Sequence, residues 1–279
     1  MLRDKIDFLK LHLNRLLSRH RKRIYQLHIQ KTGGSTVNHA FADLAYEKEK
    51  IAKIESMGKL KGLDFSSELY RGLTNAQRVV RIANRTEGRS FEGNGFKYCA
   101  WNTELFTNGD FDYGFSHIPL DQLALPEDTF IFAIFRDPLA RLVSRYKNML
   151  QLLEVEDGYK HYNFEYLEKP VREGFFSWIE ACPRGEVQSH LHLLDSTLNV
   201  ERAISRLNRI DSIHFTETLD ETLPVMMKQS ALSYNKPKRA KESSVSFELS
   251  DKEKSRAREF IRDDILVYEA AIRCSQIER

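Results

Sequence analysis

Two short apolar runs, each followed directly by a turn and a helical pattern, constrain the fold of this chain more than any other feature. Residues 24–29 read IYQLHI, and residues 129–135 read TFIFAIF. Continuous apolar runs of this length are typical of strands buried on both faces of a parallel sheet. The first run leads to two glycines, and the second leads to RDP and apolar residues at helical spacing as far as Leu150. Strands that alternate with helices predict an α/β fold with a parallel sheet.

The remaining segments fit the same outline. Short strand-like pieces are expected at FKYCAW (96–101) and FDYGFSHIP (111–119), a strand followed by a helix over 212–232, and a charged amphipathic helix over 248–272. Residues 48–96 are polar and contain several glycines, so we expect an insertion of short helices and loops there. Residues 23–279 are therefore predicted to form a single domain with an insertion at 48–96.

Residues 1–22 place leucine and isoleucine at helical spacing and lead into the basic run RHRKR. This pattern predicts an amphipathic basic helix, either packed on the domain or in contact with a membrane surface. No stretch approaches the roughly 20 apolar residues that span a bilayer. Charges interrupt the N-terminus where a signal peptide has its apolar centre. We expect a cytoplasmic protein, unless the sequence is a piece of a longer, membrane-anchored chain.

Charge and cysteine content exclude some kinds of site. The net charge of +3 is too small to indicate binding to nucleic acid. The three cysteines are far apart and form no CxxC pattern, which argues against a disulfide framework and a zinc site. His190 and His192 lack a supporting cluster, so we interpret them as ordinary helix or loop residues and expect no metal site.

The first apolar run leads into the turn QKTGGST (30–36). Gly33 and Gly34 let successive backbone amides turn inward, and the free amides and dipole of a helix start favour an anion. Lys31 precedes the glycines, whereas the lysine of the nucleotide loop GxxxxGK[ST] follows them and reaches terminal phosphates. The turn therefore predicts an anion site of another kind; a tight turn without a ligand is the alternative.

A second anion site is predicted at FRDPLARLVSRY (135–146). Pro138 suits the first turn of a helix, and Asp137 can cap its free amides. Arg136 then lies at the carboxyl end of a strand, where open α/β sheets bind ligands. Ser144 would share a face with Arg136 only if the turn bends back. For Arg145 we expect a surface salt bridge. Two anion sites on one sheet fit a ligand phosphorylated at two places.

The two motifs together, HIQKTGGST and RDPLARLVSRY, resemble the cofactor loops of sulfotransferases that use 3′-phosphoadenosine-5′-phosphosulfate (PAPS). More narrowly, they resemble those of the carbohydrate sulfotransferases of the heparan and chondroitin type (family 2), and the resemblance extends over roughly residues 24–275. It implies a P-loop-type three-layer fold, with a central parallel sheet flanked by helices, and a transfer that requires no metal. Gln30 departs from the proline usual in the family, which reduces rigidity but leaves the loop amides in place.

The resemblance also implies contacts with the cofactor. The first loop would bind the 5′-phosphosulfate through Lys31, Thr32, Gly33, Gly34, Ser35 and Thr36. The second would bind the 3′-phosphate through Arg136 and Ser144. A late loop, YNKPKR (234–239), would close over the cofactor through Asn235, Lys236 and Lys238.

Sulfuryl transfer needs a general base for the acceptor hydroxyl and a cation for the developing charge, a role we assign to Lys31. Histidine is the natural base near neutral pH. His117 is the best placed of the nine histidines, because it lies between the two loops in sequence and resembles the GHxP segment of some family members, with Ser116 in place of glycine. A histidine bonded to backbone is the alternative for His117. Carboxylates also remain candidates for the base: Glu104, Asp110 and Asp112. His28 is interpreted as a packed structural histidine.

The acceptor is expected to be a carbohydrate, and a lipid, metabolite or tyrosine hydroxyl is the alternative. Residues 48–96 and 157–170 would select it. Four aromatic residues of the second segment could stack on sugar rings or pack in the core: Tyr159, Tyr162, Phe164 and Tyr166. Four arginines of the first could hold an anionic polysaccharide or be solvated: Arg71, Arg78, Arg81 and Arg85. A P-loop kinase or nucleotide hydrolase is the competing enzyme class, and a non-catalytic nucleotide-binding protein is a third hypothesis.

Overall fold

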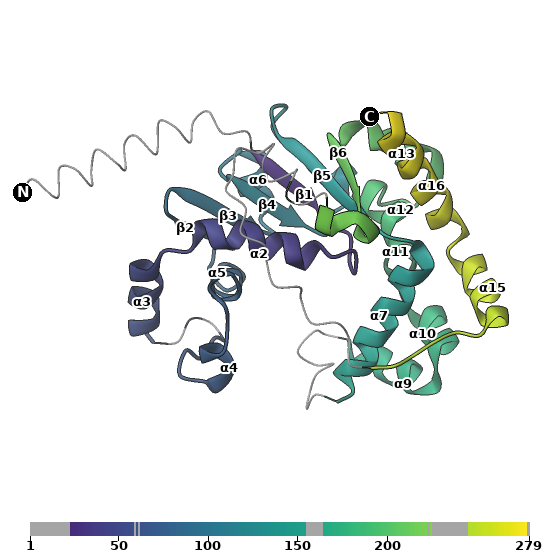
Figure 1. Cartoon of the computed structure of the whole chain (residues 1–279), viewed down its shortest axis with the longest axis horizontal. Coiled ribbons are helices and arrows are strands. Elements are labelled where there is room, and N and C mark those ends of the chain that lie inside the picture. Colours follow the sequence, from purple (N-terminus) through teal and green to yellow (C-terminus); the bar gives the residue numbers. More distant parts are fainter. Residues whose placement is uncertain are drawn as a thin grey trace, which may run out of the picture.

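A single sheet of six strands forms the centre of the computed structural model, which describes residues 23–58, 60, 62–154, 164–221, 224 and 245–277 (Figure 1). The strands lie in the order β2-β3-β4-β1-β5-β6. Their bounds are β1 Ile24–Leu27, β2 Ser90–Gly93, β3 Phe96–Ala100, β4 Tyr113–Ser116, β5 Phe130–Phe135 and β6 Ser212–Phe215. All neighbours are parallel except β2 and β3. The predicted α/β fold with a mostly parallel sheet is confirmed.

Helices flank the sheet. The α-helices are α2 (Gly34–Ala45), α3 (Lys48–Ser56), α4 (Glu68–Arg71), α5 (Asn75–Ala83), α6 (Thr103–Thr107), α7 (Pro138–Leu152), α9 (Glu165–Glu173), α10 (Phe175–Ala181), α11 (Arg184–Val187), α12 (Ser189–Leu194), α13 (Val200–Arg206), α15 (Asp251–Phe260) and α16 (Arg262–Ile277). Short 3₁₀ helices are η1 (Leu120–Gln122), η2 (Leu207–Arg209) and η3 (Thr216–Thr218). None of these helices is long and apolar enough to cross a bilayer.

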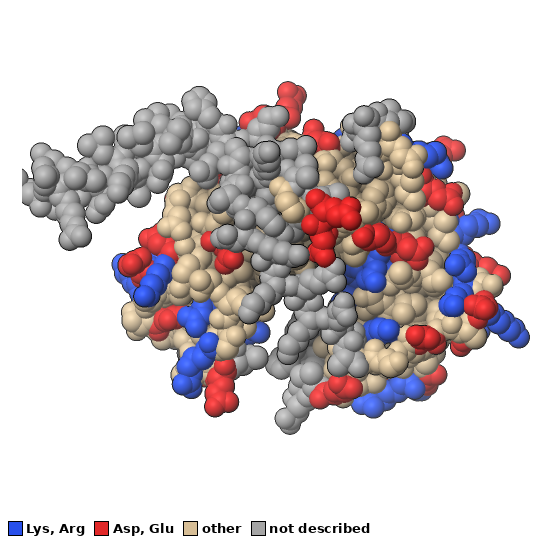
Figure 2. Space-filling view, viewed as in Figure 1, with Lys and Arg blue, Asp and Glu red and all other residues tan. Residues whose placement is uncertain are grey.

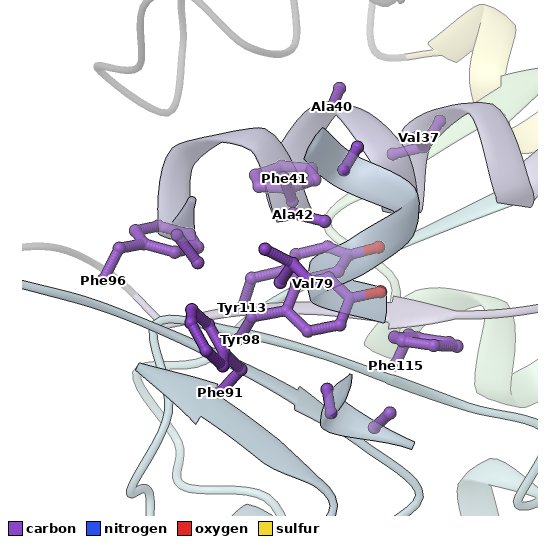
Figure 3. Packing of buried hydrophobic residues seen from close by; sticks show 14 of the residues in the cluster. Val37, Ala40, Phe41, Ala42, Val79, Phe91, Phe96, Tyr98, Tyr113 and Phe115 are labelled. Carbon is purple, nitrogen blue, oxygen red and sulfur yellow. The ribbon is translucent and has the colours of Figure 1, made fainter. Parts of the chain in front are cut away.

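The alternation of side chains along the strands divides the core between the two faces of the sheet. Phe41 of α2 stacks on Tyr113 of β4, with ring centroids 4.0 Å apart, in the cluster that joins α2 and α5 to one face (Figure 3). On the other face Tyr25 and Leu27 of β1 join a cluster with residues of α12, α13 and α16. Ile24 of β1 belongs to the first cluster, so both faces of β1 are covered and all four of its residues are buried; Gln26, its one polar residue, accepts a hydrogen bond from the Tyr113 hydroxyl.

The segment 48–96 contributes to this core. Its helices α3, α4 and α5 supply buried side chains to the same cluster as α2, and α5 packs directly on α2. The segment also ends in β2, an antiparallel edge strand that we did not predict from its composition. The expectation of short helices and loops was therefore incomplete.

The predicted helix over 248–272 is wrong as a single helix. It is broken between α15 and α16 at Ile261, which has φ −113° and ψ 18° and is fully buried. The Phe260 carbonyl accepts a hydrogen bond from the Gln188 side chain (3.1 Å). The break lets α15 pack against α7, while α16 packs against α12, α13 and β6.

Candidate active site

The carboxyl ends of four parallel strands bring the predicted site segments to one edge of the sheet. Leu27 of β1 pairs with Ser116 of β4 on one side and with Ala133 of β5 on the other. The residues that follow these strands, the loop at 28–33, His117 and Arg136, therefore lie at the same edge. Thr216 follows β6 there as well. This is the edge at which α/β proteins bind ligands.

The two glycines of the first loop are required for different reasons. Gly33 has φ +86°, a left-handed conformation that glycine adopts without strain. A Cβ atom on Gly34 would lie 2.3–2.4 Å from the His28 ring and 2.7 Å from Gln26 Nε2, so the helix starts in contact with the strand side chains. Lys31 also has positive φ (66°), which is unfavourable for a residue with a side chain. Such strain is concentrated at ligand-binding loops.

The N-terminus of α2 carries no cap of its own. Gly33 is the N-cap residue, no side chain in the described part of the protein accepts from the amides of the first turn, and that turn contains no acidic residue. The Thr36 amide donates to the Gly33 carbonyl (3.0 Å), whereas the amides of Gly34 and Ser35 have no partner among the described residues. Free amides at a helix start, together with the helix dipole, form an anion site. Among the predicted contacts, Ser35 is exposed and Thr36 half-buried at this turn. Thr32 is buried, and its hydroxyl donates to the Ile29 carbonyl (2.9 Å), so it shapes the loop.

Lys31 and Arg136 converge from the two loops. Arg136 Nη1 donates to the Lys31 carbonyl at 3.1 Å. Within the described ranges neither the Lys31 ammonium nor the Arg136 guanidinium is paired with a carboxylate. Burial lowers the pKa of Lys31, and the nearby positive charges of Arg145 and Arg136 lower it further. A bound anion would relieve this repulsion.

Asp137 and Pro138 start α7 as predicted. Asp137 accepts from the Ala140 amide (2.7 Å), and Pro138 occupies the first turn. Thr216 joins the two loops, because its hydroxyl lies 2.7 Å from the Thr32 carbonyl and 3.1 Å from the Phe135 carbonyl. Sequence reasoning missed Thr216, although its place directly after a strand at this edge was a usable signal. The half-buried Ser144 hydroxyl has no hydrogen-bond partner among the described residues.

The expected surface salt bridge of Arg145 is wrong in one respect: the salt bridge is present, but it is buried. Arg145 is only 7% exposed and bonds Glu186 through Nε (3.1 Å) and Nη2 (3.0 Å). Its guanidinium also lies over the Phe164 ring, 5.2 Å from the centroid. The charge of Arg145 lowers the pKa of both Lys31 and His117, which places this ion pair beside the candidate site.

His117 is half-buried and fixed by its neighbours. Its Nδ1 bonds the His28 carbonyl, its ring lies 4.6 Å from the His28 ring, and Trp101 packs edge-on at 4.5 Å. Burial lowers the pKa of His117 to about 4, and Arg145 contributes in the same direction. Ser116, which replaces the glycine of GHxP, holds the turn: its hydroxyl accepts from the Ile118 amide (3.0 Å) and pairs with Tyr25 (2.6 Å).

Two of the alternative bases lie at the wrong edge of the sheet. Asp110 and Asp112 precede β4, whereas His117 follows it. Asp110 pairs with Lys97, and Asp112 accepts from the Lys97 amide (2.7 Å). Glu104 is exposed in the first turn of α6, which follows β3 at the site edge. Among the carboxylates considered, only Glu104 shares an edge with the loops that follow β1 and β5.

His28 is a packed structural residue, as predicted: it is 8% exposed, and its Nδ1 lies 3.5 Å from Asn38 Nδ2. His190 is more than the ordinary helix residue that we expected. It is fully buried, and its Nε2 accepts from the Arg136 amide at 3.4 Å. Its hydrogen-bond partners Arg136 and Asp264 lie 54 and 74 residues away in sequence, so these contacts could not be predicted from sequence spacing.

Several predicted residues lie outside the described part of the chain. These are the N-terminal helix at 1–22, Tyr159 and Tyr162, and the late loop with Asn235, Lys236 and Lys238. Of the four arginines at 71–85, Arg78 is paired with Glu55 (3.2 Å) and lies over Tyr70. No cluster of three or more potential metal ligands occurs among the residues that the structure describes.

The surface beside the second loop is acidic. On the face in Figure 2, acidic side chains gather over the segment that follows β6. In this segment Glu217, Asp220 and Glu221 are exposed. Glu217 Oε1 lies 3.4 Å from the Asp137 amide, which places one of these carboxylates beside the start of α7.

Family models and curated proteins were compared with the chain. No model of a known protein family matches the chain, and no curated protein matches it. The functional assignment therefore rests on the geometry of this edge and on the two sequence motifs.

Proposed function

We propose that this chain is a sulfotransferase that moves the sulfuryl group of PAPS to a hydroxyl of a carbohydrate acceptor. One observation carries the proposal: Lys31 and Arg136, joined through the Lys31 carbonyl and without a described carboxylate partner, flank the uncapped start of α2. Two cationic contacts on either side of one helix start suit a nucleotide with phosphates at two positions.

The proposed donor site assigns each phosphate to one loop of a P-loop-type fold. The 5′-phosphosulfate would lie on the amides that begin α2, with Lys31 against the bridging oxygen. The 3′-phosphate would bind the Arg136 guanidinium, with the Ser144 hydroxyl as a second donor. Lys31 precedes Gly33 and is held by strained backbone, so its ammonium serves the 5′ end of the nucleotide and not a terminal phosphate.

The proposed base is His117, and its hydrogen bond selects the reacting nitrogen. The His28 carbonyl can only accept, so His117 Nδ1 carries the proton and Nε2 keeps a free lone pair. With its pKa lowered to about 4, the imidazole is neutral at physiological pH. In the transfer, Nε2 takes the proton of the acceptor hydroxyl as its oxygen bonds sulfur. The bond from sulfur to the bridging oxygen breaks, and adenosine 3′,5′-bisphosphate leaves with the electron pair.

Lys31 would stabilise the charge that grows on the bridging oxygen. This contact is stronger in the transition state than in the ground state, so it contributes to rate. Trp101 is half-buried beside His117, and we assign to its ring the contact with the sugar of the acceptor. This aromatic ring supports a carbohydrate acceptor.

Calorimetry with two nucleotides separates this proposal from a kinase or nucleotide hydrolase. We expect adenosine 3′,5′-bisphosphate to bind without Mg²⁺ and more tightly than ATP with Mg²⁺. Tight, Mg²⁺-dependent ATP binding together with no binding of the bisphosphate would overturn the proposal.

A further inference from the structure

A buried chain of hydrogen bonds reaches the backbone of Arg136 from the far end of the protein sequence. The Arg136 amide donates to His190 Nε2 (3.4 Å), and His190 Nδ1 lies 2.7 Å from Asp264 Oδ2. Asp264 Oδ1 accepts from the Leu191 amide (2.8 Å). His190 and Asp264 are both fully buried, so water does not compete for these bonds.

The two hydrogen bonds of the His190 ring require the same protonation state and tautomer. An amide N–H faces Nε2, so Nε2 must present a lone pair. A carboxylate faces Nδ1, so Nδ1 must carry the proton. A neutral imidazole with its proton on Nδ1 satisfies both partners, and neither the imidazolium nor the other tautomer does.

The ring is also held flat against the strand that leads to Arg136. His190 stacks on Phe135, with centroids 5.3 Å apart and planes 10° apart. Phe135 is the last residue of β5, directly before Arg136. One side chain therefore fixes both the end of the strand and the first amide of the loop.

Asp264 is itself anchored, which makes the support rigid. The Arg141 guanidinium lies 3.9 Å from Asp264 and donates to the carbonyls of Glu186 and Val187. Burial alone would raise the pKa of Asp264, but His190 and the positive charge of Arg141 together hold it below its usual range. The network thereby connects α16, α12 and α7 behind the loop.

We infer that His190 is a positioning residue for the 3′-phosphate: it fixes the Arg136 backbone so that the guanidinium is aimed before the nucleotide arrives. This inference rests on the proposed function, because it assigns Arg136 to the 3′-phosphate. It predicts an effect on the affinity for 3′-phosphorylated nucleotides and none on the chemical step.

Two variants separate the two ends of the ring. In His190→Asn the amide nitrogen replaces Nδ1 and can still donate to Asp264, but nothing reaches the Arg136 amide. In His190→Gln the amide oxygen replaces Nε2 and can accept from the Arg136 amide. Both are small polar changes at the same position, so each is the control for the other.

We expect His190→Asn to weaken binding of adenosine 3′,5′-bisphosphate by about two- to tenfold, the range of one net hydrogen bond. Binding of adenosine 5′-phosphate should be unchanged, and His190→Gln should recover most of the loss. In turnover assays the Asn variant should raise KM for PAPS and leave kcat unchanged. Equal weakening of both nucleotides, or no change in either, would overturn the inference.

The state of the ring is tested in the wild-type protein by ¹⁵N NMR of the histidine side chains. A neutral His190 with the proton on Nδ1 supports the inference, and an imidazolium or a proton on Nε2 overturns it even if the Asn variant fails to fold. Failure of the proposed function has another signature: the wild-type protein would then show no preference for the bisphosphate over adenosine 5′-phosphate.

Discussion

The helices α2 and α7 both begin at the same edge of the sheet, yet their N-termini differ. The first turn of α2 has neither a side-chain cap nor an acidic residue, whereas Asp137 caps α7 and Pro138 removes one of its amides. Among the described residues, the Gly34 and Ser35 amides that begin α2 have no partner, so two adjacent amides are available for an anion there. At α7 an anion must be bound by side chains, and Arg136 is in place to do so.

This difference implies a division of labour. The α2 side carries Lys31 and, through the His28 carbonyl, His117, which are the groups proposed to act on the reacting atoms. The α7 side carries Arg136, which is proposed to bind the 3′-phosphate, a part of the nucleotide that does not react. Substitutions on the α2 side should therefore change rate, and those on the α7 side should change affinity.

The largest effect is expected for His117→Ala. Loss of a positioned general base should lower sulfation by about 10²–10⁴-fold. The affinity for adenosine 3′,5′-bisphosphate should remain, because the proposed role of His117 is toward the acceptor and not the nucleotide. Steady-state kinetics together with calorimetry of the product nucleotide measure both quantities. Retained activity would transfer the role to Glu104, and lost nucleotide affinity would make His117 part of the cofactor pocket.

The pH dependence of kcat/KM sharpens the same prediction. Only neutral imidazole accepts a proton, so the rate should rise with pH through about 4, the lowered pKa of His117, and then stay level through neutrality. It should fall again at alkaline pH, where Lys31, whose pKa is also lowered, loses its proton. An acid limb near the ordinary histidine pKa, about 6.5, would contradict this assignment.

Lys31→Ala should lower kcat by about 10²–10³-fold, the usual loss for one preorganised electrostatic contact in the transition state. Binding of the bisphosphate should weaken far less, since the charge that Lys31 meets develops only during transfer. Lys97→Ala is the matched control, because Lys97 pairs with Asp110 at the opposite edge of the sheet. Normal turnover in Lys31→Ala would remove Lys31 from the mechanism.

Arg136→Ala should weaken adenosine 3′,5′-bisphosphate by about 1.5–3 kcal/mol, the contribution of a charged hydrogen bond. Adenosine 5′-phosphate should bind as before, and kcat should change little. Arg172→Ala, which removes an exposed ion pair with Glu168, serves as the control. If calorimetry shows that the affinities for both nucleotides fall equally, Arg136 does not bind the 3′-phosphate, and the proposed difference between the α2 side and the α7 side is wrong.

The smallest effect is expected for Glu217→Gln. The amide oxygen of glutamine can keep the contact with the Asp137 amide while the negative charge beside Arg136 disappears. The bisphosphate should then bind about twofold more tightly at low salt, and the gain should vanish at high salt because exposed charges are screened. If adenosine 5′-phosphate gains affinity by a similar factor, the charge of Glu217 acts on any bound anion and not specifically on the 3′-phosphate at the α7 side.

Local patterns predicted the features of the site that depend on neighbouring residues. The apolar run 129–135, Asp137 and Pro138 were sufficient to place Arg136 at a strand end, and the structure agrees. His190 could not be found in this way, because its partners Arg136 and Asp264 are distant in sequence. The same is true of the burial of Arg145, whose partner Glu186 lies 41 residues away.

Proximity in sequence was misleading for the carboxylates around His117. Asp112 is five residues from His117, but the four residues of β4 between them carry the chain across the sheet. Similarly, a continuous helical pattern over 248–272 does not reveal that Phe260 and Ile261 break the helix to meet Gln188 and the core. Such breaks are decided by packing partners elsewhere in the chain.

The central claim is tested most directly by transfer of labelled sulfate from PAPS. The wild-type protein is incubated with PAPS and a panel of polysaccharide and other hydroxyl acceptors in the presence of a metal chelator, and products are identified by mass spectrometry. We expect labelled sulfate on a carbohydrate hydroxyl together with one adenosine 3′,5′-bisphosphate for each sulfate transferred. A parallel incubation contains ATP and Mg²⁺ without the chelator. Transfer or hydrolysis of the ATP γ-phosphate there, together with no sulfation of any acceptor in the PAPS incubation, would contradict the claim.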